Sequence, residues 1–579
     1  MSTTLERAGW TSLHCFLHWS ARDFDEFLTG SVRPVLDGAR ADGALADWFY
    51  IRYWEGGPHL RLRARDVRDP HRMRCLLARR VAASARPVLD LTRESFPPTA
   101  RRQSAWFSHG AVEEIEYRPE TRRYGGPDAL PVMERVFCRS TEIALDALAA
   151  APQSRLTAAL GLVYATALGL GLDDLATARW LRGAAGAWRW STDVPMLPAA
   201  TVLGNATRTL SANADGLRDR LAALRSGWDR HGGVEGRWAR VVADAHGELA
   251  GSDTPADGRW LIPWASQAHM LCNRLGVQPD EERALCWLIS GALLGHTEPD
   301  AFLADSATSA DRVFLERSKL LPGLRGQVPP ATSPPDATSQ WPAQAVVDLP
   351  GGPPPDVPIG AAIELRQSAR RFVGPVRAAE IGTLVRTAFA ARRARTIRRP
   401  EGSVTFPLRG YPSAGGMYLT QLRLLVADVD GIEPGDYRVD PIQAQLHRLG
   451  EHPALDELAA TSTWFVADPA TSDAVDAGAI DISRTPAMLV LSVDLDRARA
   501  KYGVRALRFA LLEAGHLAQN LVLVAAAARL ASITIGGFYD DVVHELLGID
   551  GVGESVQYLI PLGSARDPGG LSGTTTTES

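Results

Sequence analysis

A proline-rich segment past the middle of the chain limits the possible folds more than any other feature of the sequence. From Gln327 to Pro358 it reads QVPPATSPPDATSQWPAQAVVDLPGGPPPDVP. Each proline fixes its own φ angle and removes a backbone donor, so this density favours an extended, semi-rigid spacer. At 579 residues the chain is also too long for one ordinary core. We therefore expect a domain over residues 1–326, a spacer over 327–357, a second domain over 358–567 and a disordered polar tail over 568–579.

Composition and charge exclude several classes of protein. Hydrophobic residues make up 45% of the chain and charged residues 22%, as in globular proteins. The net charge of −5 argues against a surface built mainly for nucleic acid. The five cysteines are scattered, which favours neither a disulfide framework nor a zinc site. No signal peptide is visible, and no apolar stretch reaches the roughly 20 residues of a membrane helix. We expect a soluble, cytoplasmic protein with no bound metal, no membrane contact and no direct contact with nucleic acid.

The first domain contains a predicted β-hairpin that is rich in arginine. Residues 48–65 read WFYIRYWEGGPHLRLRAR, two runs of β-forming residues around a Glu-Gly-Gly-Pro turn. Side chains alternate between the faces of a strand, so every second residue of the second run shares a face. That face is either a solvated strand surface or a site for an anionic group, because guanidinium forks hold carboxylates at two points. Its residues are His59, Arg61, Arg63 and Arg65.

Two further segments of the first domain carry candidate polar chemistry. Residues 113–126, EEIEYRPETRRYGG, are dense in charge and end in a Gly-Gly breaker. Residues 266–276, SQAHMLCNRLG, have a helical pattern that should stop at Gly276. His269 in this helix is either a structural histidine or a group that transfers protons. With the hairpin, these segments describe an arginine-rich pocket that has one candidate catalytic histidine.

Taken in order, the runs I-R-Y…H-L-R-L-R, E-x-x-R-Y-G-G and H-M-x-x-N-R-L resemble the elimination domain of class I lanthipeptide dehydratases. The resemblance implies that a separate enzyme first glutamylates a serine or threonine of a ribosomally made precursor peptide, using glutamyl-tRNA. This domain would then expel the glutamate and leave dehydroalanine or dehydrobutyrine.

The same resemblance assigns roles by position. Arg52 and Arg123 would hold the glutamyl carboxylates, and Glu120, one helical turn before Arg123, would orient it or assist proton transfer. His269 would move the α-proton or protonate the departing glutamate. The hairpin residues expected to bind substrate are His59, Arg61 and Arg63.

Two alternatives remain for this domain. Thiopeptide pyridine synthases resemble it too, although ring formation expels no glutamate and needs no such carboxylate pocket. The other alternative is a non-catalytic module that binds a peptide and presents it to the second domain.

Helical and strand patterns alternate in the second domain. Apolar spacing predicts a helix over 376–391 and a long helix from about 501 to 530. Strands are predicted over 421–429 and 555–563, and a hairpin over 434–449. This mixture indicates an α+β layer fold, which is the fold class expected for the chain. The apolar positions of the long helix are Leu507, Leu511, Ala514, Leu517 and Leu521.

Three features of this domain suggest a phosphorylated planar cofactor. Two arginines flank Ser368 at a helix entrance, where donors suit a phosphate. The run PSAGG at 412–416 has no bulky side chain, as close approach to a ring system requires, and Gly536-Gly537 offers a second approach. A glycine-rich loop alone is more often a simple turn. The sequence has neither a G-x-G-x-x-G after a strand nor a G-x-x-x-x-G-K-[ST], which disfavours Rossmann and P-loop sites.

The runs R-x-S-x-R-x-F, Y-P-S-A-G-G-x-Y, K-Y-G…E-A-G-H-x-A-Q-N and Y-L-I-P-L-G together resemble the FMN-dependent nitroreductase fold, in its azoline-dehydrogenase branch. The resemblance covers residues 358–563 and implies FMN as the cofactor, with dioxygen reoxidising it. The implied FMN contacts are Arg366, Ser368, Arg370, Ser413, Ala414, Gly415, Gln519, Asn520, Gly536 and Gly537.

Lys501 and Tyr502 correspond to the catalytic Lys-Tyr pair of that branch, which simple nitroreductases lack. FMN accepts a hydride equivalent, but aromatising an azoline also requires a base that removes a proton from an adjacent carbon. A neighbouring Lys⁺ favours a phenolate, which makes Tyr502 a competent base; Lys501 is the alternative base. The pair could also simply open the long helix.

The order of the two domains resembles the bifunctional enzymes of lactazole-type thiopeptide biosynthesis. These make both dehydroalanines and azoles on one precursor peptide. The tRNA-dependent glutamylation enzyme and the cyclodehydratase would be separate partners, and the nitroreductase resemblance implies a homodimer through the flavin domain. The competing class is a general NAD(P)H-dependent flavin nitroreductase with an accessory domain.

Overall fold

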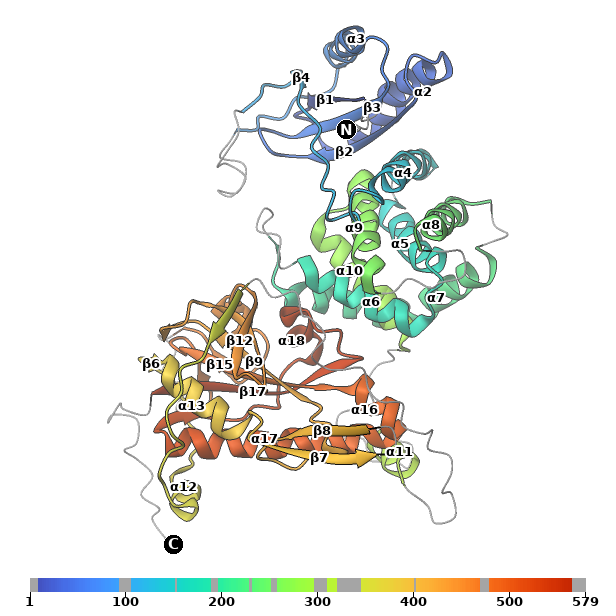
Figure 1. The fold of residues 1–579 in the computed structure, drawn as a ribbon. Coiled ribbons are helices and arrows are strands. Elements are labelled where there is room, and N and C mark those ends of the chain that lie inside the picture. Colours follow the sequence, from blue (N-terminus) through green and yellow to red (C-terminus); the bar gives the residue numbers. More distant parts are fainter. Residues whose placement is uncertain are drawn as a thin grey trace, which may run out of the picture. The chain divides into compact units, whose positions relative to one another are not determined.

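The computed structural model describes residues 9–92, 106–150, 154–188, 196–228, 232–250, 258–295, 310–319, 345–399, 402–468 and 478–564. Helices and sheets are mixed throughout these ranges, which confirms the expected α+β fold class. The chain divides into two compact units, Met1–Glu298 and Pro299–Ser579, and each is described by itself (Figure 1).

The first unit opens with a four-stranded antiparallel sheet. Its strands are β1 (Trp10–Phe16), β2 (Asp47–Tyr53), β3 (His59–Arg65) and β4 (Val112–Glu114), in the spatial order β2-β3-β1-β4. The β2–β3 pair is the hairpin predicted over residues 48–65, which is thereby confirmed.

One face of this sheet forms a hydrophobic core with three helices. The helices are α1 (Ala21–Phe27), α2 (Arg33–Ala41) and α3 (Pro70–Ala82), and a π-helical turn, η1 (Leu28–Val32), joins the first two. Leu60, Leu62 and Ala64 of β3 are buried in this core. Since side chains alternate along a strand, the other residues of β3, including the predicted arginine face, point to the opposite side.

A group of helices follows in the same unit. These are α4 (Leu130–Ala150), α5 (Arg155–Gly169), α6 (Asp174–Ala187), α7 (Ala199–Gly227), α8 (Val234–Ala250), α9 (Gly258–Leu275) and α10 (Pro279–Leu293). Helix α9 ends just before Gly276, as predicted. It contacts both α4 and strand β2, so residues on α9 lie beside the hairpin.

The second unit is built on a seven-stranded sheet in the spatial order β16-β17-β15-β9-β11-β12-β5. Three predictions are confirmed: the strand over 421–429, the hairpin over 434–449 and the closing strand over 555–563. The strands are β5 (Ala345–Asp348), β9 (Thr420–Val426), β11 (Gly435–Val439), β12 (Gln445–Gly450), β15 (Ala487–Asp494), β16 (Leu530–Ser532) and β17 (Glu554–Ser564). Strand β5 falls inside the predicted spacer, where it pairs with β12 as an edge strand.

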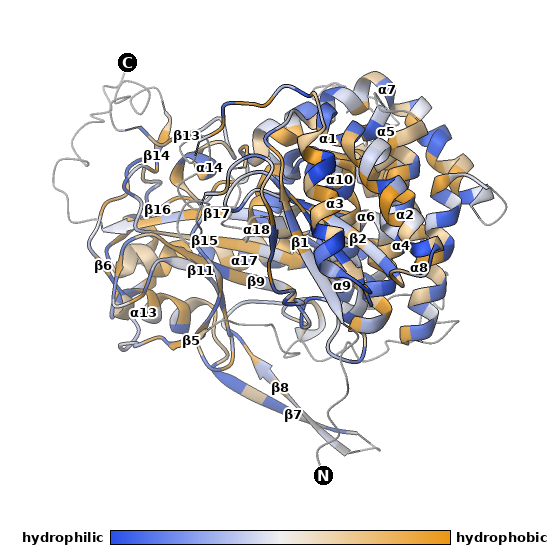
Figure 2. Ribbon diagram, turned by 90° about the horizontal axis from the view of Figure 1, so that it is seen from above, coloured by the Kyte–Doolittle hydropathy of each residue, from blue (hydrophilic) through white to orange (hydrophobic). Residues whose placement is uncertain are grey.

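A separate hairpin consists of β7 (Arg393–Arg399) and β8 (Gly402–Leu408). Within the described residues, these two strands pair only with each other. Figure 2 shows the hairpin extending away from the sheet and helices of its unit.

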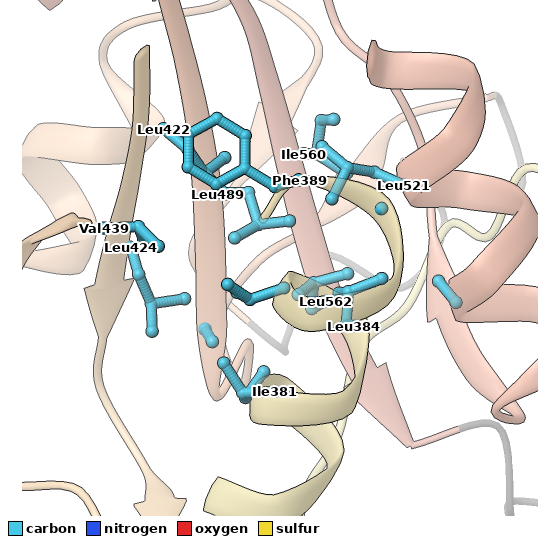
Figure 3. Close-up of a cluster of buried hydrophobic side chains, with 14 of the residues drawn as sticks. Ile381, Leu384, Phe389, Leu422, Leu424, Val439, Leu489, Leu521, Ile560 and Leu562 are labelled. Carbon is cyan, nitrogen blue, oxygen red and sulfur yellow. The ribbon is translucent and has the colours of Figure 1, made fainter. Parts of the chain in front are cut away.

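Helices cover both faces of the seven-stranded sheet. On one face, α13 (Ala378–Ala388) and α17 (Ala506–Ala527) enclose the cluster of buried side chains drawn in Figure 3. On the other face, α14 (Leu455–Ala459) and α18 (Asp540–Leu547) pack on Leu425, Met488 and Val490. Each large apolar side chain that is fully buried contributes roughly 1.5–3 kcal/mol. The side chains labelled in Figure 3 are Ile381, Leu384, Phe389, Leu422, Leu424, Val439, Leu489, Leu521, Ile560 and Leu562.

Two buried polar contacts fix strand β9. The side chains of Arg423 and Asp436, 6% and 3% exposed, form an ion pair in which Arg423 Nε donates to Asp436 Oδ1 at 3.2 Å. Glu513 of α17 accepts hydrogen bonds from the backbone N–H and the hydroxyl of Thr420, at 2.8 and 3.0 Å. Since Thr420 opens β9, the second contact also holds the segment that precedes this strand.

The long helix predicted over 501–530 is divided in two. Helix α16 (Leu495–Tyr502) is followed by a 3-10 turn, η7 (Gly503–Arg505), and then by α17. Leu511 is 45% exposed, although the apolar pattern placed it inside; Leu517 and Leu521 are buried as predicted. By length and composition alone, Leu495–Ala527 is long and apolar enough to cross a membrane, contrary to the expectation that no apolar stretch reaches that length. The burial of Leu517 and Leu521 in the sheet core is typical of a core helix.

The division between the units comes before the predicted boundary at residue 326. Helix α11 (Ala310–Arg317) belongs to the second unit, where the carbonyl of Ser318 accepts a hydrogen bond from Arg505 Nη1 at 2.8 Å. Residues 327–344 of the predicted spacer and the predicted tail over 568–579 lie outside the described residues.

Candidate functional site

One face of helix α9 gathers several candidate residues of the first unit. Ser266, His269 and Asn273 are three and then four positions apart, so they share one face of the helix. Each of them contacts a residue from a different segment of the unit. The helix therefore acts as a common support for elements that are far apart in the sequence.

Arg123 is held through two nitrogens of its guanidinium group. Its Nε donates to Ser266 Oγ at 3.0 Å, and its Nη1 donates to Glu120 Oε2 at 3.0 Å. The backbone N–H of Arg123 also donates to the carbonyl of Glu120 at 2.9 Å. The predicted proximity of Glu120 and Arg123 is confirmed, but they meet across a turn and not along a helix. The turn presents a positive and a negative side chain together.

His269 forms a unit with Glu282 and Trp188. Its Nδ1 lies 2.9 Å from Glu282 Oε2, and the indole of Trp188 meets the imidazole edge-on, with 4.5 Å between ring centroids. Trp188 Nε1 also donates to Glu282 Oε1 at 3.4 Å. Glu282 lies in the first turn of α10 and is 7% exposed. A carboxylate on Nδ1 orients the ring and leaves Nε2 as the nitrogen that can exchange a proton.

His59 is a neutral support for Arg61. Burial lowers the pKa of His59 to about 3, so its imidazole carries no charge near neutral pH. Arg61 Nε donates to His59 Nε2 at 3.0 Å, which leaves the ring proton on Nδ1, where it donates to the carbonyl of Gly57 at 2.8 Å. The guanidinium of Arg61 lies 3.6 Å from the centroid of the Tyr53 ring. Burial lowers the pKa of Arg61, and the charges of Tyr53, Glu55 and Glu120 partly offset that lowering.

Arg63 is more enclosed than Arg61. Its guanidinium lies 4.4 Å from the centroid of the Tyr117 ring and 5.6 Å from that of Phe49. Burial lowers the pKa of Arg63 to about 10, so it remains charged at neutral pH. Arg274, fully buried, lies 5.9 Å from the same Phe49 ring, and its Nη1 and Nη2 have no hydrogen-bond partner within the described ranges. Two enclosed guanidinium groups make this side of the sheet strongly positive.

Arg52 does not join these residues. It pairs in register with Leu60, so its side chain leaves the sheet on the face opposite to the arginine face of β3. There its Nη2 bonds to Asp25 Oδ1 at 2.5 Å, and its Nε donates to the carbonyl of Arg274 at 3.0 Å. Only the backbone of Arg52 meets the face of α9, through Asn273 at 2.8 and 2.9 Å. The role of Arg52 in holding a substrate carboxylate stays a prediction, and in this structure its guanidinium is paired with Asp25.

In the second unit, Lys501 and Tyr502 meet the glycine-rich loop at Gly415. The φ angle of Gly415 is 60°, and a Cβ atom at this position would lie 2.6 Å from Lys501 Nζ and closer still to the Tyr502 hydroxyl. Lys501 Nζ lies 5.3 Å from the centroid of the Tyr502 ring. An ammonium, a phenol and a bare stretch of backbone thus come together from segments more than 80 residues apart.

The loop is held in shape by its own residues. Ser413 Oγ accepts a hydrogen bond from the N–H of Tyr418 at 2.8 Å. The hydroxyl of Tyr418 accepts one from the N–H of Arg409 at 2.9 Å. Ser413, predicted as a contact of FMN, therefore also closes the loop around Ala414 and Gly415.

Helix α17 ties the loop to the core of the unit. Asn520 Nδ2 donates to the carbonyl of Gly410 at 3.2 Å, and its neighbour Gln519 is exposed. Of the two predicted cofactor contacts on this helix, Asn520 is thus beside the loop, and Gln519 is available on the surface.

The predicted phosphate-binding residues lie beside strand β16. Ser368 forms an isolated parallel bridge with Ser532, and the carbonyl of Arg370 accepts a hydrogen bond from the N–H of Asp481 at 2.8 Å. Arg366 Nη1 lies 3.5 Å from Ser368 Oγ. Ser368 and Arg370 are exposed, so hydroxyl and guanidinium groups reach the surface together.

Gly536 and Gly537 follow β16 and lie next to an exposed aromatic ring. The carbonyl of Gly537 accepts a hydrogen bond from Ser462 Oγ at 2.6 Å. A Cβ atom at Gly537 would lie 3.4 Å from Nε1 of Trp464, which is 54% exposed. The bare backbone and the indole plane are suited to a flat ring system.

The arginine–serine segment at Ser368 and the glycine-rich loop at Gly415 lie toward opposite ends of strand β15. Ser532, beside Ser368, shares a row of the sheet with Ala487 at the start of the strand. Thr420, just after the glycine-rich loop, pairs with Val493 near the other end. The strand spans about 20 Å between these rows, at roughly 3.3 Å per residue. One chain therefore does not bring the arginine–serine segment to the lysine–tyrosine pair.

Several residues of these sites were absent from the predicted sets, among them Asn273, Glu282 and Trp464. Asn273 stands inside the H-M-x-x-N-R-L run, so the motif itself contained the signal. Glu282 is part of P-D-E-E at the start of a helix, where acidic residues are ordinary. No sequence spacing distinguished it from a helix cap. Trp464 lies in a short segment with no recognised motif.

The two units match two different family models. Residues 10–293 match the family described as lantibiotic biosynthesis dehydratase C-term, and residues 363–564 match the nitroreductase family. A protein of Methanocaldococcus jannaschii that is named as a nitroreductase is 30% identical over 154 residues, 26% of this chain and 68% of that protein. The structure of the pyridine synthase TbtD from thiomuracin biosynthesis is 19% identical over 50% of this chain and 98% of that one, with a TM-score of 0.41. That of the tRNA-dependent lantibiotic dehydratase MibB from Microbispora sp. is 22% identical over 51% and 29%, with a TM-score of 0.31.

Proposed function

This chain belongs to the nitroreductase family through its second unit and carries a lantibiotic dehydratase C-terminal domain ahead of it, and we propose that it is a bifunctional tailoring enzyme of ribosomally made peptides. The first unit would eliminate glutamate from glutamylated serine or threonine, as in thiopeptide biosynthesis. The second would oxidise thiazolines and oxazolines to thiazoles and oxazoles with FMN. The observation that carries the proposal is the meeting of Lys501 and Tyr502 at Gly415, because ring oxidation needs a base beside the flavin.

Elimination needs a base and a holder for the leaving glutamate, and the first unit offers both. His269, oriented by Glu282, takes the α-proton at Nε2. The electron pair of that C–H bond forms the Cα=Cβ double bond, and the Cβ–O bond breaks. Glutamate leaves as a carboxylate, which Arg123 would bind through its guanidinium fork, with Arg52 and the substrate-binding Arg61 as the further candidates. The step needs no external oxidant or reductant.

The second unit has residues that fit a flavin. At Gly415 a side chain would collide with the lysine–tyrosine pair, so the bare loop keeps a space that a ring can approach. FMN, when bound, supplies the acceptor for a hydride equivalent. Tyr502 removes the proton from the adjacent ring carbon, and Lys501 stabilises the phenolate by its positive charge. The substrate loses two hydrogens in all, one to the base and one to the flavin.

Two copies of the chain would complete each flavin site. The arginine–serine segment and the glycine-rich loop lie toward opposite ends of β15, so within one chain they are far apart. A second chain could supply one of them to the site of the first. Helices α12 (Ile359–Leu365) and α17 contact each other and expose large apolar side chains that are 45–75% accessible. Such a surface is typical of a protein–protein interface. The exposed residues are Ile359, Ile363, Leu365, Leu511 and Leu512.

The partners follow from the two reactions. The substrate is a ribosomally made precursor peptide. A separate tRNA-dependent enzyme glutamylates it, and a separate cyclodehydratase makes its azolines. The chain would work in the cytoplasm, with no direct contact to nucleic acid and none to a membrane.

Mass spectrometry of one precursor peptide tests both halves. A peptide that carries azolines and glutamyl esters is incubated with the purified protein, FMN and dioxygen. We expect a loss of two hydrogens for each ring oxidised and a loss of one glutamate for each ester eliminated.

Each alternative has its own outcome in this experiment. Retention of all glutamyl esters, with rings oxidised, assigns the first unit to peptide presentation. Formation of a six-membered ring from two dehydroalanines assigns it to pyridine synthesis. Rapid NAD(P)H consumption with no loss of hydrogens from the rings assigns the second unit to general nitro- or quinone reduction.

A further inference from the structure

The β7–β8 hairpin carries several arginines, and the described residues of its two strands include no acidic side chain. Arg393, Arg395 and Arg398 are exposed, and they have no ion-pair partner in the part of the chain that the structure describes. Strand β8 contributes no acidic residue. Much of β7 is drawn in blue in the hydropathy colouring of Figure 2. Like charges so close together repel one another, so the hairpin is suited to an anionic ligand.

The register of the hairpin places apolar side chains among these charges. Arg393 pairs with Leu408, and Arg395 pairs with Phe406, so all four side chains share one face. Phe406 and Leu408 are half-buried. Successive arginines on this face repeat every second residue, as do side chains of one face of any extended strand. The face therefore matches an extended chain that carries acidic and apolar side chains.

The backbone of the hairpin can accept another strand. Each of its two strands pairs with the other alone among the described residues, so each has an outer edge with no strand beside it. An exposed edge is a template for an added strand, and peptide ligands use such edges in β-augmentation. Main-chain bonds would supply affinity here, and the arginines would select for acidic side chains.

The hairpin leads directly into the candidate oxidation site. Strand β8 ends at Leu408, and Gly415, which meets Lys501 and Tyr502, follows seven residues later. A peptide added along β8 would cover about 23 Å, at roughly 3.3 Å per residue, beside the strand that precedes this loop in the chain.

We propose that the β7–β8 hairpin docks an acidic, extended segment of the peptide substrate and so delivers a neighbouring azoline to the glycine-rich loop. This inference rests on the proposed peptide substrate of the second unit. The apolar side chains among the arginines and the free strand edges favour a peptide over a nucleic acid, whose phosphates would use the charge alone.

Binding is measured first, on the full FMN-loaded chain. The probe is a fluorescein-labelled peptide of alternating glutamate and valine, with an alternating lysine–valine peptide as its matched control. Fluorescence anisotropy should show that the acidic peptide binds and the basic one does not. In R393E/R395E the affinity for the acidic peptide should fall roughly tenfold or more, because attraction is replaced by repulsion. R484E, which reverses an exposed arginine outside the hairpin, should bind the peptide as the native protein does.

Three results would overturn the inference. The first is that R393E/R395E binds the acidic peptide as tightly as the native chain does. The second is that the hairpin binds tRNA more tightly than the peptide, and the third is that R393E/R395E loses dimerisation but keeps peptide binding. The variant R393Q/R395Q, which removes the charge on the same face without reversing it, replaces the double variant if that one fails to fold.

A kinetic comparison separates this inference from the proposed function. A thiazoline peptide is offered with and without an acidic extension, and the ratio of the two kcat/KM values is compared between R393E/R395E and R484E. The ratio should fall roughly tenfold in the first and stay at the native value in the second. If the native chain oxidises neither peptide, the proposed oxidation is wrong while docking still stands on the anisotropy. If it oxidises both equally well, docking alone is wrong.

Discussion

The two candidate sites of this chain are built in opposite ways. In the first unit, side chains hold one another by charge: Arg123 by Glu120, and His269 by Glu282. In the second unit, the backbone makes the site, because Gly415 leaves the space that a side chain would fill. The first site should therefore respond to changes of charge and the second to changes of volume. The first site is gathered on one helix, whereas we propose that two chains complete the second.

The largest effect is expected for His269→Ala. The variant lacks the group that we propose takes the α-proton, so glutamate release should fall by about 10²–10⁴-fold, the usual contribution of general acid–base catalysis. Ring oxidation should stay at the native rate, since it belongs to the other unit. Mass spectrometry of the doubly modified precursor reads both reactions at once. His71→Ala, at an exposed position on α3, is the matched control and should release glutamate normally.

Gly415→Ala tests the second site by volume alone. The new Cβ would meet Lys501 and Tyr502, so azoline oxidation should fall by about 100-fold, the loss typical of a misplaced catalytic group. Gly416→Ala is the control, because its φ angle of 66° is close to the 60° of Gly415, while its Cβ would meet nothing within 4 Å. Both variants carry the cost of a side chain at positive φ, roughly 1–2 kcal/mol of stability. Equal loss of oxidation in the two would mean that backbone strain, not the collision, is responsible.

Glu282→Gln tests the first site by charge alone. The amide keeps an oxygen for His269 Nδ1 but lacks the negative charge, so glutamate release should fall roughly tenfold, as when other histidine-orienting partners are changed. Nitrogen-15 shifts of the ring report whether the proton stays on Nδ1. Glu281→Gln, next to it but without a contact to His269, should release glutamate at the native rate. An unchanged rate in Glu282→Gln would reduce Glu282 to a packing residue.

The smallest effect concerns the stability of the first unit in mild acid. Burial lowers the pKa of His14 to about 2 and that of His59 to about 3, and the two rings stack at 4.9 Å. Both values lie below the 6.5 of an unfolded histidine, so the unfolded chain takes up protons more readily. Stability is therefore complete above pH 6.5 and is lost as the pH falls toward 3, by up to about 1.4 kcal/mol per pH unit for each ring.

Calorimetry at several pH values checks this expectation. The unfolding temperature of the first unit should fall between about pH 6.5 and pH 5, and His14→Phe should reduce the slope by about half, because one of the two titrating rings is gone. A slope that is the same in the variant and the native chain would place the acid sensitivity elsewhere.

Much of the local structure could be predicted from the sequence. The alternation of WFYIRY and HLRLRAR predicted the hairpin and the face that carries Arg61 and Arg63. Gly276 marked the end of α9. These features depend on backbone geometry within a few residues, which a sequence pattern expresses directly.

The sequence motifs identified candidate site residues, but they did not always identify the side chains that these residues contact. Arg52 was grouped with the carboxylate-binding arginines, yet its place opposite Leu60 sends it to the other face, where Asp25 neutralises it. The alternation of side chains along the two strands of the hairpin was enough to predict that Arg52 lies on this other face. That alternation could not identify Asp25 as the partner of Arg52, because only tertiary packing brings helix α1 against the sheet.

The sequence by itself determined the two-module composition, the arginine face of the hairpin, the glycine-rich loop and the lysine–tyrosine pair, because each is written in adjacent or periodically spaced residues. The tertiary structure decided which of them meet. It placed Lys501 and Tyr502 at Gly415, set Glu282 behind His269, and left the arginine–serine segment at the far end of β15. The physical reason is that these contacts join residues far apart in the chain, and only the packing of helices on sheets fixes the distances between them.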